Sequence, residues 1–86
     1  MGGPLCESGD IFTQEEGGFV CARELPVAAV GDFLVIECAG AYGFVMGSNY
    51  NSKPLSAEVL IDGGTAHLVR KRQTPEDIVA GEMIPS

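Results

Sequence analysis

Two short apolar runs near the C-terminus are separated by a pair of glycines, and this arrangement constrains the fold more than any other part of the chain. The runs are Glu58–Asp62 and Thr65–Arg70, with Gly63-Gly64 between them. A two-residue glycine loop between β-prone runs is a strong β-hairpin signal, because glycine adopts the positive φ angles that the tightest hairpin turns require. These residues therefore predict two antiparallel strands.

Other short runs extend this pattern toward a mainly β fold. Phe33–Cys38 is rich in β-branched and aromatic residues and is apolar on both faces until Glu37, which predicts a central strand. Phe19–Ala22 predicts a further short strand. Several short strands at this spacing, punctuated by 12 glycines and 5 prolines, favour a Greek-key β-sandwich or small barrel.

Only the C-terminal region predicts a helix. Thr74 suits the N-cap, Pro75 suits the first helical position, and Glu76 and Asp77 complement the positive end of the helix dipole. Gly81 then ends the helix. The predicted fold class is thus mainly β with one short C-terminal helix.

Length and charge restrict the function further. With 86 residues, the chain is expected to form one domain, residues 1–86. A net charge of −7 argues against nucleic acid as a partner, since phosphate binding needs clustered Lys and Arg. No apolar run approaches the roughly 20 residues that span a bilayer, so we expect no membrane partner. Three cysteines without CxxC spacing favour neither a disulfide framework nor a metal site, and a cytoplasmic location is expected.

The segment Cys6-Glu7-Ser8-Gly9-Asp10 places a thiol beside a carboxylate on a glycine-containing turn. An un-ionised thiol can give a proton to a carbanion-like carbon, and a carboxylate can bind a substrate ammonium group. The alternative is a buried cysteine beside a solvated glutamate. Asp10 is expected to fix the turn by an Asx-type bond rather than to act as a base.

A second dense patch surrounds Tyr42. Gly40 and Gly43 lie close to it, and small neighbours allow a ligand to approach the backbone, where a phenol can donate to a phosphate oxygen. The alternative is a sheet tyrosine with its hydroxyl at the surface. The polar stretch Ser48–Ser52 follows and, taken alone, predicts a turn.

No complete catalytic set is present in the sequence. His67 is the only histidine and is expected to be structural, and there is no nucleophile–base pair. Lys53 and Lys71 are the only lysines, and neither lies in the apolar stretch that a cofactor-binding lysine needs. Spacing alone therefore predicts a binding or interaction domain.

Taken in order, the motifs resemble the C-terminal domain of the diaminopimelate decarboxylase family, pyridoxal-phosphate enzymes with an alanine-racemase-type barrel. The resemblance rests on Gly3–Asp10, Gly40–Gly43, Ser48–Ser52 and Glu58–Gly64, and it runs from about Gly3 to Asp77. Three departures stand out: Lys53 where the family more often has Arg, Leu55-Ser56 where basic character is usual, and a segment from Gln14 to Ala22 that is longer than typical.

The resemblance implies that Cys6 is the proton donor to the decarboxylated carbon, Glu7 binds the amine-bearing end of the amino-acid substrate, and Tyr42 contacts the cofactor phosphate or the substrate. It also implies that pyridoxal phosphate is held mainly by a barrel domain, of the same or a partner subunit, in a homodimer. The barrel and its lysine are absent from these residues, so the chain alone is expected to be inactive.

Two other functions stay open on the sequence. One is a free-standing β-sandwich that binds a partner or small ligand without catalysis. The other is the same domain in a related decarboxylase of basic amino acids, which Glu7 disfavours because those relatives tend to have Asp after the cysteine.

Overall fold

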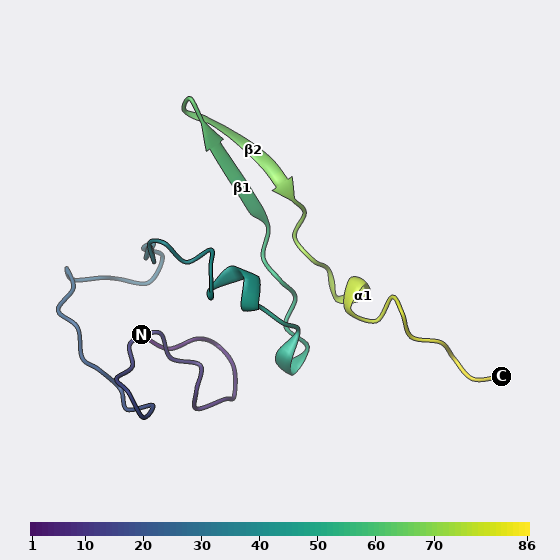
Figure 1. Cartoon of the computed structure of the whole chain (residues 1–86), viewed down its shortest axis with the longest axis horizontal. Coiled ribbons are helices and arrows are strands. Elements are labelled where there is room, and N and C mark those ends of the chain that lie inside the picture. The colour runs from purple at the N-terminus through teal and green to yellow at the C-terminus, as the bar shows by residue number, and fades with distance from the viewer. The chain divides into compact units, whose positions relative to one another are not determined.

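The computed structural model describes all 86 residues, which form two compact units, Met1–Ile36 and Glu37–Ser86. The regular elements all belong to the second unit (Figure 1). In chain order they are the 3-10 helices η1 (Phe44–Met46) and η2 (Tyr50–Ser52), the strands β1 (Glu58–Asp62) and β2 (Thr65–Arg70), and the helix α1 (Pro75–Ile78). None of these helices is long and apolar enough to cross a membrane.

Strands β1 and β2 form an antiparallel hairpin, as the sequence predicts, with the same bounds. Gly63 and Gly64 have φ angles of 56° and 79°, the positive values at both central positions that a type I′ turn requires. The register shifts between Glu58 and Val59, which is a bulge of the kind that increases local twist. At the open end of the hairpin, Arg70 forms an ion pair with Glu58.

Helix α1 begins as predicted and ends earlier than expected. The Thr74 hydroxyl accepts the Asp77 backbone N–H, and the Asp77 carboxylate accepts the Thr74 backbone N–H, which is a complete capping box. The helix ends at Ile78, before Gly81, because Val79 leaves helical geometry at ψ 5°. The prediction of a mainly β chain with one short C-terminal helix is confirmed.

The first unit is built from turns and two isolated antiparallel bridges, Gly2 with Ile11 and Gln14 with Val20. The strand expected at Phe19–Ala22 is thus reduced to a single bridged residue. It follows the tight turn in which the Gly18 N–H donates to the Glu15 carbonyl, and the Glu15 N–H donates to the Phe19 carbonyl. This unit is held by local backbone bonds and not by a ladder.

The central strand expected at Phe33–Cys38 is not formed. Residues 32–36 are irregular and residues 37–38 form a turn, where Cys38 has a left-handed φ of 55°. A strand that is apolar on both faces needs a hydrogen-bonded neighbour and a covered surface, and no segment of this chain pairs with it. Phe33 is 96% exposed as a result. A Greek-key order needs four paired strands and stays a prediction.

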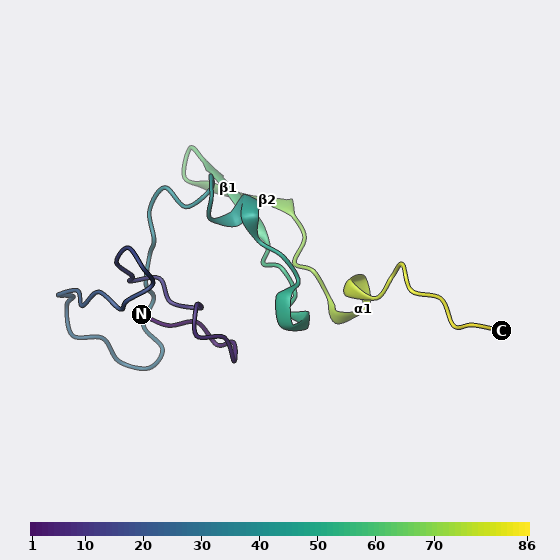
Figure 2. The same cartoon turned by 60° about the horizontal axis from the view of Figure 1, so that its bottom comes forward.

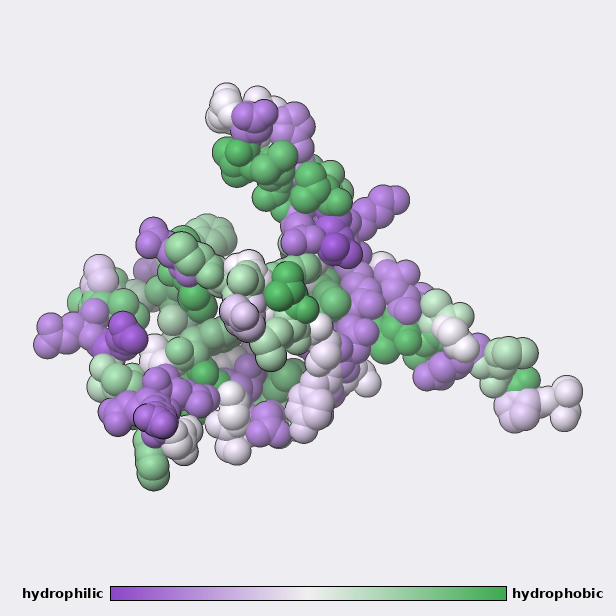
Figure 3. Space-filling model, in the orientation of Figure 1, coloured by the Kyte–Doolittle hydropathy of each residue, from purple (hydrophilic) through white to green (hydrophobic).

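No side chain of the 86 residues is fully buried. Within the second unit, apolar side chains cover the middle of the β1–β2 hairpin, between hydrophilic residues at its tip and its base (Figure 3). In a self-sufficient domain such residues line a core that is closed to water. In this structure, water reaches the apolar surfaces of the chain.

Candidate functional site

Cys6 and Glu7 lie on a loop that Asp10 closes. The Gly3 N–H donates to the Asp10 carbonyl over 2.7 Å, and the Leu5 N–H donates to Asp10 Oδ2 over 3.0 Å. The Asp10 side chain does fix this turn, but the Asx-type bond predicted for it is wrong: the bond spans five residues and comes from an upstream N–H. These two hydrogen bonds to Asp10 close the loop that carries Cys6 and Glu7.

The tip of this loop is a tight turn that orients Glu7. The Asp10 N–H donates to the Glu7 carbonyl over 3.0 Å, and the Gly9 N–H donates to Glu7 Oε1 over 3.0 Å. Glu7 and Cys6 are both exposed, and none of the chain's cysteines is in a disulfide. The alternative of a buried cysteine is therefore wrong. Thiol and carboxylate are exposed neighbours on one fixed turn.

Tyr42 belongs to the second unit, in a short loop before η1. The Phe44 N–H donates to the Ala39 carbonyl over 2.8 Å and closes this loop. A Cβ atom at Gly43 would collide with the Ala39 carbonyl, so the closure requires glycine there. Tyr42 itself has a left-handed φ of 59° and is 87% exposed.

The backbone of Tyr42 is strained, and this bears on function. The left-handed conformation costs a residue other than glycine about 1–2 kcal/mol, and such strain is concentrated at functional sites. The strained loop presents a phenol to the surroundings instead of packing it on the sheet. This geometry suits a hydrogen-bond donor for a ligand that the chain alone does not enclose.

The polar stretch Ser48–Ser52 is a turn, as predicted, and contains η2. A residue that the sequence did not indicate holds it: the Gln73 side chain accepts hydrogen bonds from the Leu55 N–H and the Asn49 amide. These partners are 18 and 24 residues away along the chain. No local pattern signals a contact at such a separation, which is why it was missed.

The remaining candidates do not form a second site. His67 lies in β2 opposite Leu60 and is exposed, and its structural role stays a prediction. Lys53 and Lys71 are exposed, so neither has the apolar surroundings of a cofactor-binding lysine. No group of three His, Cys, Asp or Glu residues is placed to hold a metal ion. The one resolved pKa change belongs to Asp77, in the cap of α1.

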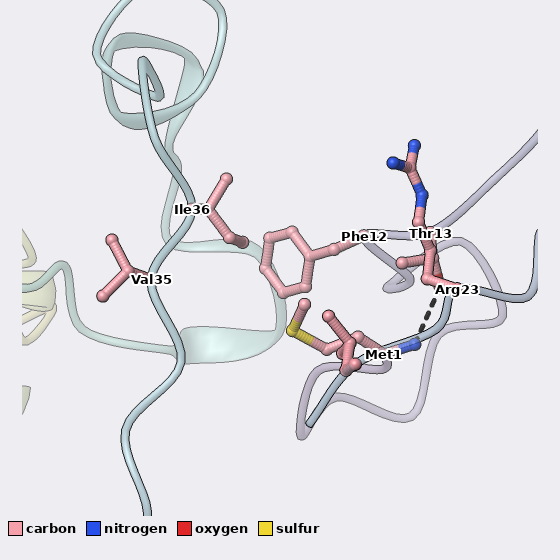
Figure 4. A pocket seen from close by; sticks show the side chains of 7 residues that line it. Met1, Phe12, Thr13, Arg23, Val35 and Ile36 are labelled. Atoms are coloured by element: carbon pink, nitrogen blue, oxygen red, sulfur yellow. Dashed lines mark hydrogen bonds between the residues drawn. The ribbon is translucent and has the colours of Figure 1, made fainter. Parts of the chain in front are cut away.

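The first unit also contains an apolar pocket of about 280 Å³ (Figure 4). In the close-up, the side chains of Met1 and Ile36 point toward the ring of Phe12, and the Met1 amino group donates to Thr13 Oγ1 over 2.8 Å. Neither Cys6 nor Glu7 lines this pocket. It is therefore separate from the thiol and carboxylate of the candidate site.

The structure thus brings two of the three predicted site residues together. Cys6 and Glu7 share the closed loop of the first unit, whereas Tyr42 lies on its own closed loop of the second unit. All three are exposed. The roles of these residues in one pocket stay a prediction.

The structure defines the class only as far as a mainly β chain with one antiparallel hairpin, whose thiol, carboxylate and phenol are exposed. The sequence profile described as the pyridoxal-dependent decarboxylase, C-terminal sheet domain, matches residues 1–40. The resemblance to this domain, which the sequence motifs indicated, is therefore confirmed.

The individual proteins that this chain resembles are diaminopimelate decarboxylases. The chain is 57% identical to diaminopimelate decarboxylase of Escherichia coli K12 over 84 residues, which is 98% of this chain and 20% of that protein. It is 52% identical to the Streptomyces coelicolor enzyme of the same name over 85 residues, which is 99% of this chain and 19% of that one.

A crystal structure of diaminopimelate decarboxylase matches the fold with a TM-score of 0.88 at 59% identity, over 94% of this chain and 19% of that chain. The chain thus spans about one fifth of the length of the curated relatives that it matches. It is similar to the diaminopimelate decarboxylases in both sequence and fold.

Proposed function

We propose that residues 1–86 act as the C-terminal substrate-binding and dimerisation domain of a diaminopimelate decarboxylase, which converts meso-diaminopimelate to L-lysine and CO2. The observation that carries the proposal is the similarity over nearly the whole chain, 57% identity across 98% of it. The thiol, carboxylate and phenol support it chemically, because all three are exposed on loops that backbone hydrogen bonds close.

Each of the three side chains has a role in this reaction. When the substrate loses CO2, an electron pair stays on its α-carbon, and the Cys6 thiol delivers a proton to that atom. Glu7 binds the ammonium group at the far end of the substrate by a charge-assisted hydrogen bond. Its hydrogen bond from the Gly9 N–H fixes the carboxylate for this role. Tyr42 donates its hydroxyl to the cofactor phosphate or to the substrate.

Pyridoxal phosphate is the cofactor that this family implies, and these residues fit a part of its site. The Tyr42 phenol, exposed on a strained loop, suits a phosphate oxygen. The exposed Lys53 and Lys71 do not suit the cofactor-binding lysine, so a barrel domain would hold the cofactor. When bound, pyridoxal phosphate supplies the electron sink for decarboxylation.

The proposed partners are the barrel domain, of the same or a partner subunit, and a second copy of the enzyme in a homodimer. The exposed apolar side chains of both units support this assembly, since they lack the cover that a stable fold gives them. A free-standing interaction module finds no such support, because it would need a core of its own. Nothing in the geometry favours a related amino-acid decarboxylase over this one.

The test is a chimera in which this chain replaces the matching 84-residue segment of the E. coli decarboxylase. We expect the chimera to form lysine from meso-diaminopimelate. Changing Cys6→Ala should lower its kcat by about 10²–10⁴-fold, the range for a lost general acid. Cys38→Ala is the matched control, because Cys38 is also exposed and has no role in the proposal.

Two outcomes would refute the proposal. One is a folded chimera that binds pyridoxal phosphate and forms no lysine. The other is a Cys6→Ala chimera as active as the Cys38→Ala control.

A further inference from the structure

Gln73 lies three residues beyond β2 and is half-buried. Its side-chain Oε1 accepts the Leu55 N–H over 2.9 Å and also accepts the Asn49 amide. Its own backbone N–H donates to the Leu55 carbonyl over 3.0 Å. Gln73 therefore binds both the N–H and the carbonyl of Leu55. These hydrogen bonds connect the segment after β2 to the segment before β1 (Figure 2).

The same side chain controls the stretch before Leu55. Asn49, held by Gln73, donates from its amide to the Lys53 carbonyl over 3.1 Å. The Asn49 carbonyl accepts the Ser52 N–H over 2.8 Å. One glutamine thus fixes both ends of the segment Asn49–Leu55, which we call the clamped loop.

The clamped loop needs such a restraint, because it contains two consecutive left-handed residues. Asn51 has φ 54° and Ser52 has φ 57°. Strained conformations persist only where the surrounding structure over-determines them. No residue of this loop is fully buried, and the Gln73 hydrogen bonds to Asn49 and Leu55 restrain its two ends.

The clamp also reaches the segment that carries Tyr42. A Cβ atom at Gly47 would lie 3.3 Å from Leu55 Cδ2, so the Leu55 side chain packs against the end of the Gly40–Gly47 stretch. Gln73 fixes the backbone of Leu55 on both sides. A continuous series of contacts therefore runs from Gln73 through Leu55 to the Tyr42 segment.

From this series of contacts we propose that Gln73 is a positioning residue of the decarboxylase, which sets the clamped loop and the Tyr42 segment in the geometry that substrate binding requires. The inference rests on the proposed function. Gln73 acts through Asn49 and Leu55 and touches no reacting atom. Its Oε1 is the main group, because that atom receives two N–H groups, while its Nε2 donates a longer bond of 3.5 Å to Asn49 Oδ1.

The test uses the chimera with the E. coli decarboxylase and three variants. Gln73→Leu removes the side-chain amide and its three hydrogen bonds, and we expect kcat/KM for meso-diaminopimelate to fall about ten- to hundredfold. Gln73→Glu keeps the acceptor oxygen and loses only the long donation to Asn49 Oδ1, so it should restore kcat/KM to within about threefold of the unaltered chimera. Arg72→Leu, at the exposed neighbouring position, is the control and should leave kcat/KM unchanged.

Amide hydrogen exchange at Leu55 and Ser52, measured without substrate, separates this inference from the proposed function. In Gln73→Leu these two amides should exchange at least about tenfold faster, while the melting temperature stays within about 2 °C of the control. Faster exchange with an unchanged kcat/KM, or unchanged exchange, would overturn the positioning role. An inactive unaltered chimera would count against the proposed function, while the exchange data would still decide whether Gln73 holds the loop.

Discussion

Tyr42 shows how a single residue can be placed against its own backbone preference. Its left-handed φ of 59° is imposed by closure of the loop between Ala39 and Phe44, which Gly43 permits. Cys6 and Glu7 instead lie on a loop that Asp10 closes by accepting hydrogen bonds from the Leu5 and Gly3 N–H groups. In both cases, backbone hydrogen bonds within a few residues orient an exposed side chain, without help from a core.

At this scale, the variant Tyr42→Asn should separate stability from activity. Asparagine tolerates the left-handed region better than tyrosine, so we expect the free energy of unfolding of the chimera to rise by up to about 1 kcal/mol. Lysine formation should fall, because the phenol is lost. Urea unfolding and a decarboxylation assay measure the two effects.

Tyr42→Phe is the matched comparison for this variant. It removes the hydroxyl and keeps the strain, so its stability should equal that of the unaltered chimera while its activity falls. A Tyr42→Phe chimera with full activity would exclude the hydroxyl from the reaction.

The β1–β2 hairpin and the start of α1 formed as predicted, because neighbouring residues in the sequence specify each of them. The two-glycine turn and the capping box each contain, within a few residues, every group that the element needs. The expected strand Phe33–Cys38 lacks this property, because a strand is completed by a neighbour that its own sequence does not specify. Local sequence was therefore sufficient for the hairpin and the start of α1, and insufficient for the central strand.

The cap of α1 gives a pH prediction. Hydrogen bonds from Thr74, first from its backbone N–H and then from its side chain, lower the pKa of the Asp77 carboxyl below its ordinary value of 3.8. The charged form is thus favoured in the folded state. Its contribution to stability is present above pH 3.8 and is lost as the pH falls through the lower folded pKa.

We therefore expect the Thr74 amide resonance in the chimera to titrate with a midpoint below pH 3.8. Asp77→Asn should abolish this titration. Glu76→Gln, in the same helical turn, should leave the midpoint unchanged, because the capping box does not include Glu76. A midpoint at or above 3.8 would contradict the capping argument.

The whole molecule lacks a closed core. Every one of its large apolar side chains keeps contact with water, and Phe33 and Val35 are 96% and 83% exposed. Burial of apolar surface is the main favourable contribution to folding, so hydrogen bonds and turns alone leave little net stability. The assembly proposed above would cover these side chains.

At the scale of the molecule, we expect the isolated 86 residues to unfold without a cooperative transition. Circular dichroism in urea should change gradually, and amides outside the β1–β2 hairpin should exchange at nearly unfolded rates. Within the chimera, the amides of Phe33–Ile36 should become protected. A sigmoidal transition of the isolated residues, with an m-value of about 1 kcal/mol/M or more, would contradict this expectation.

The sequence by itself determined the hairpin, the cap of α1, the turn at Cys6 and Glu7, and the resemblance to the decarboxylase domain. These features depend on groups a few residues apart, or on motifs that can be recognised in order along the chain. Only the tertiary structure decided the strained backbone of Tyr42 and the clamp from Gln73 to Leu55 and Asn49. Loop closure and contacts between distant residues depend on the path of the chain in space, and no local pattern of side chains specifies that path.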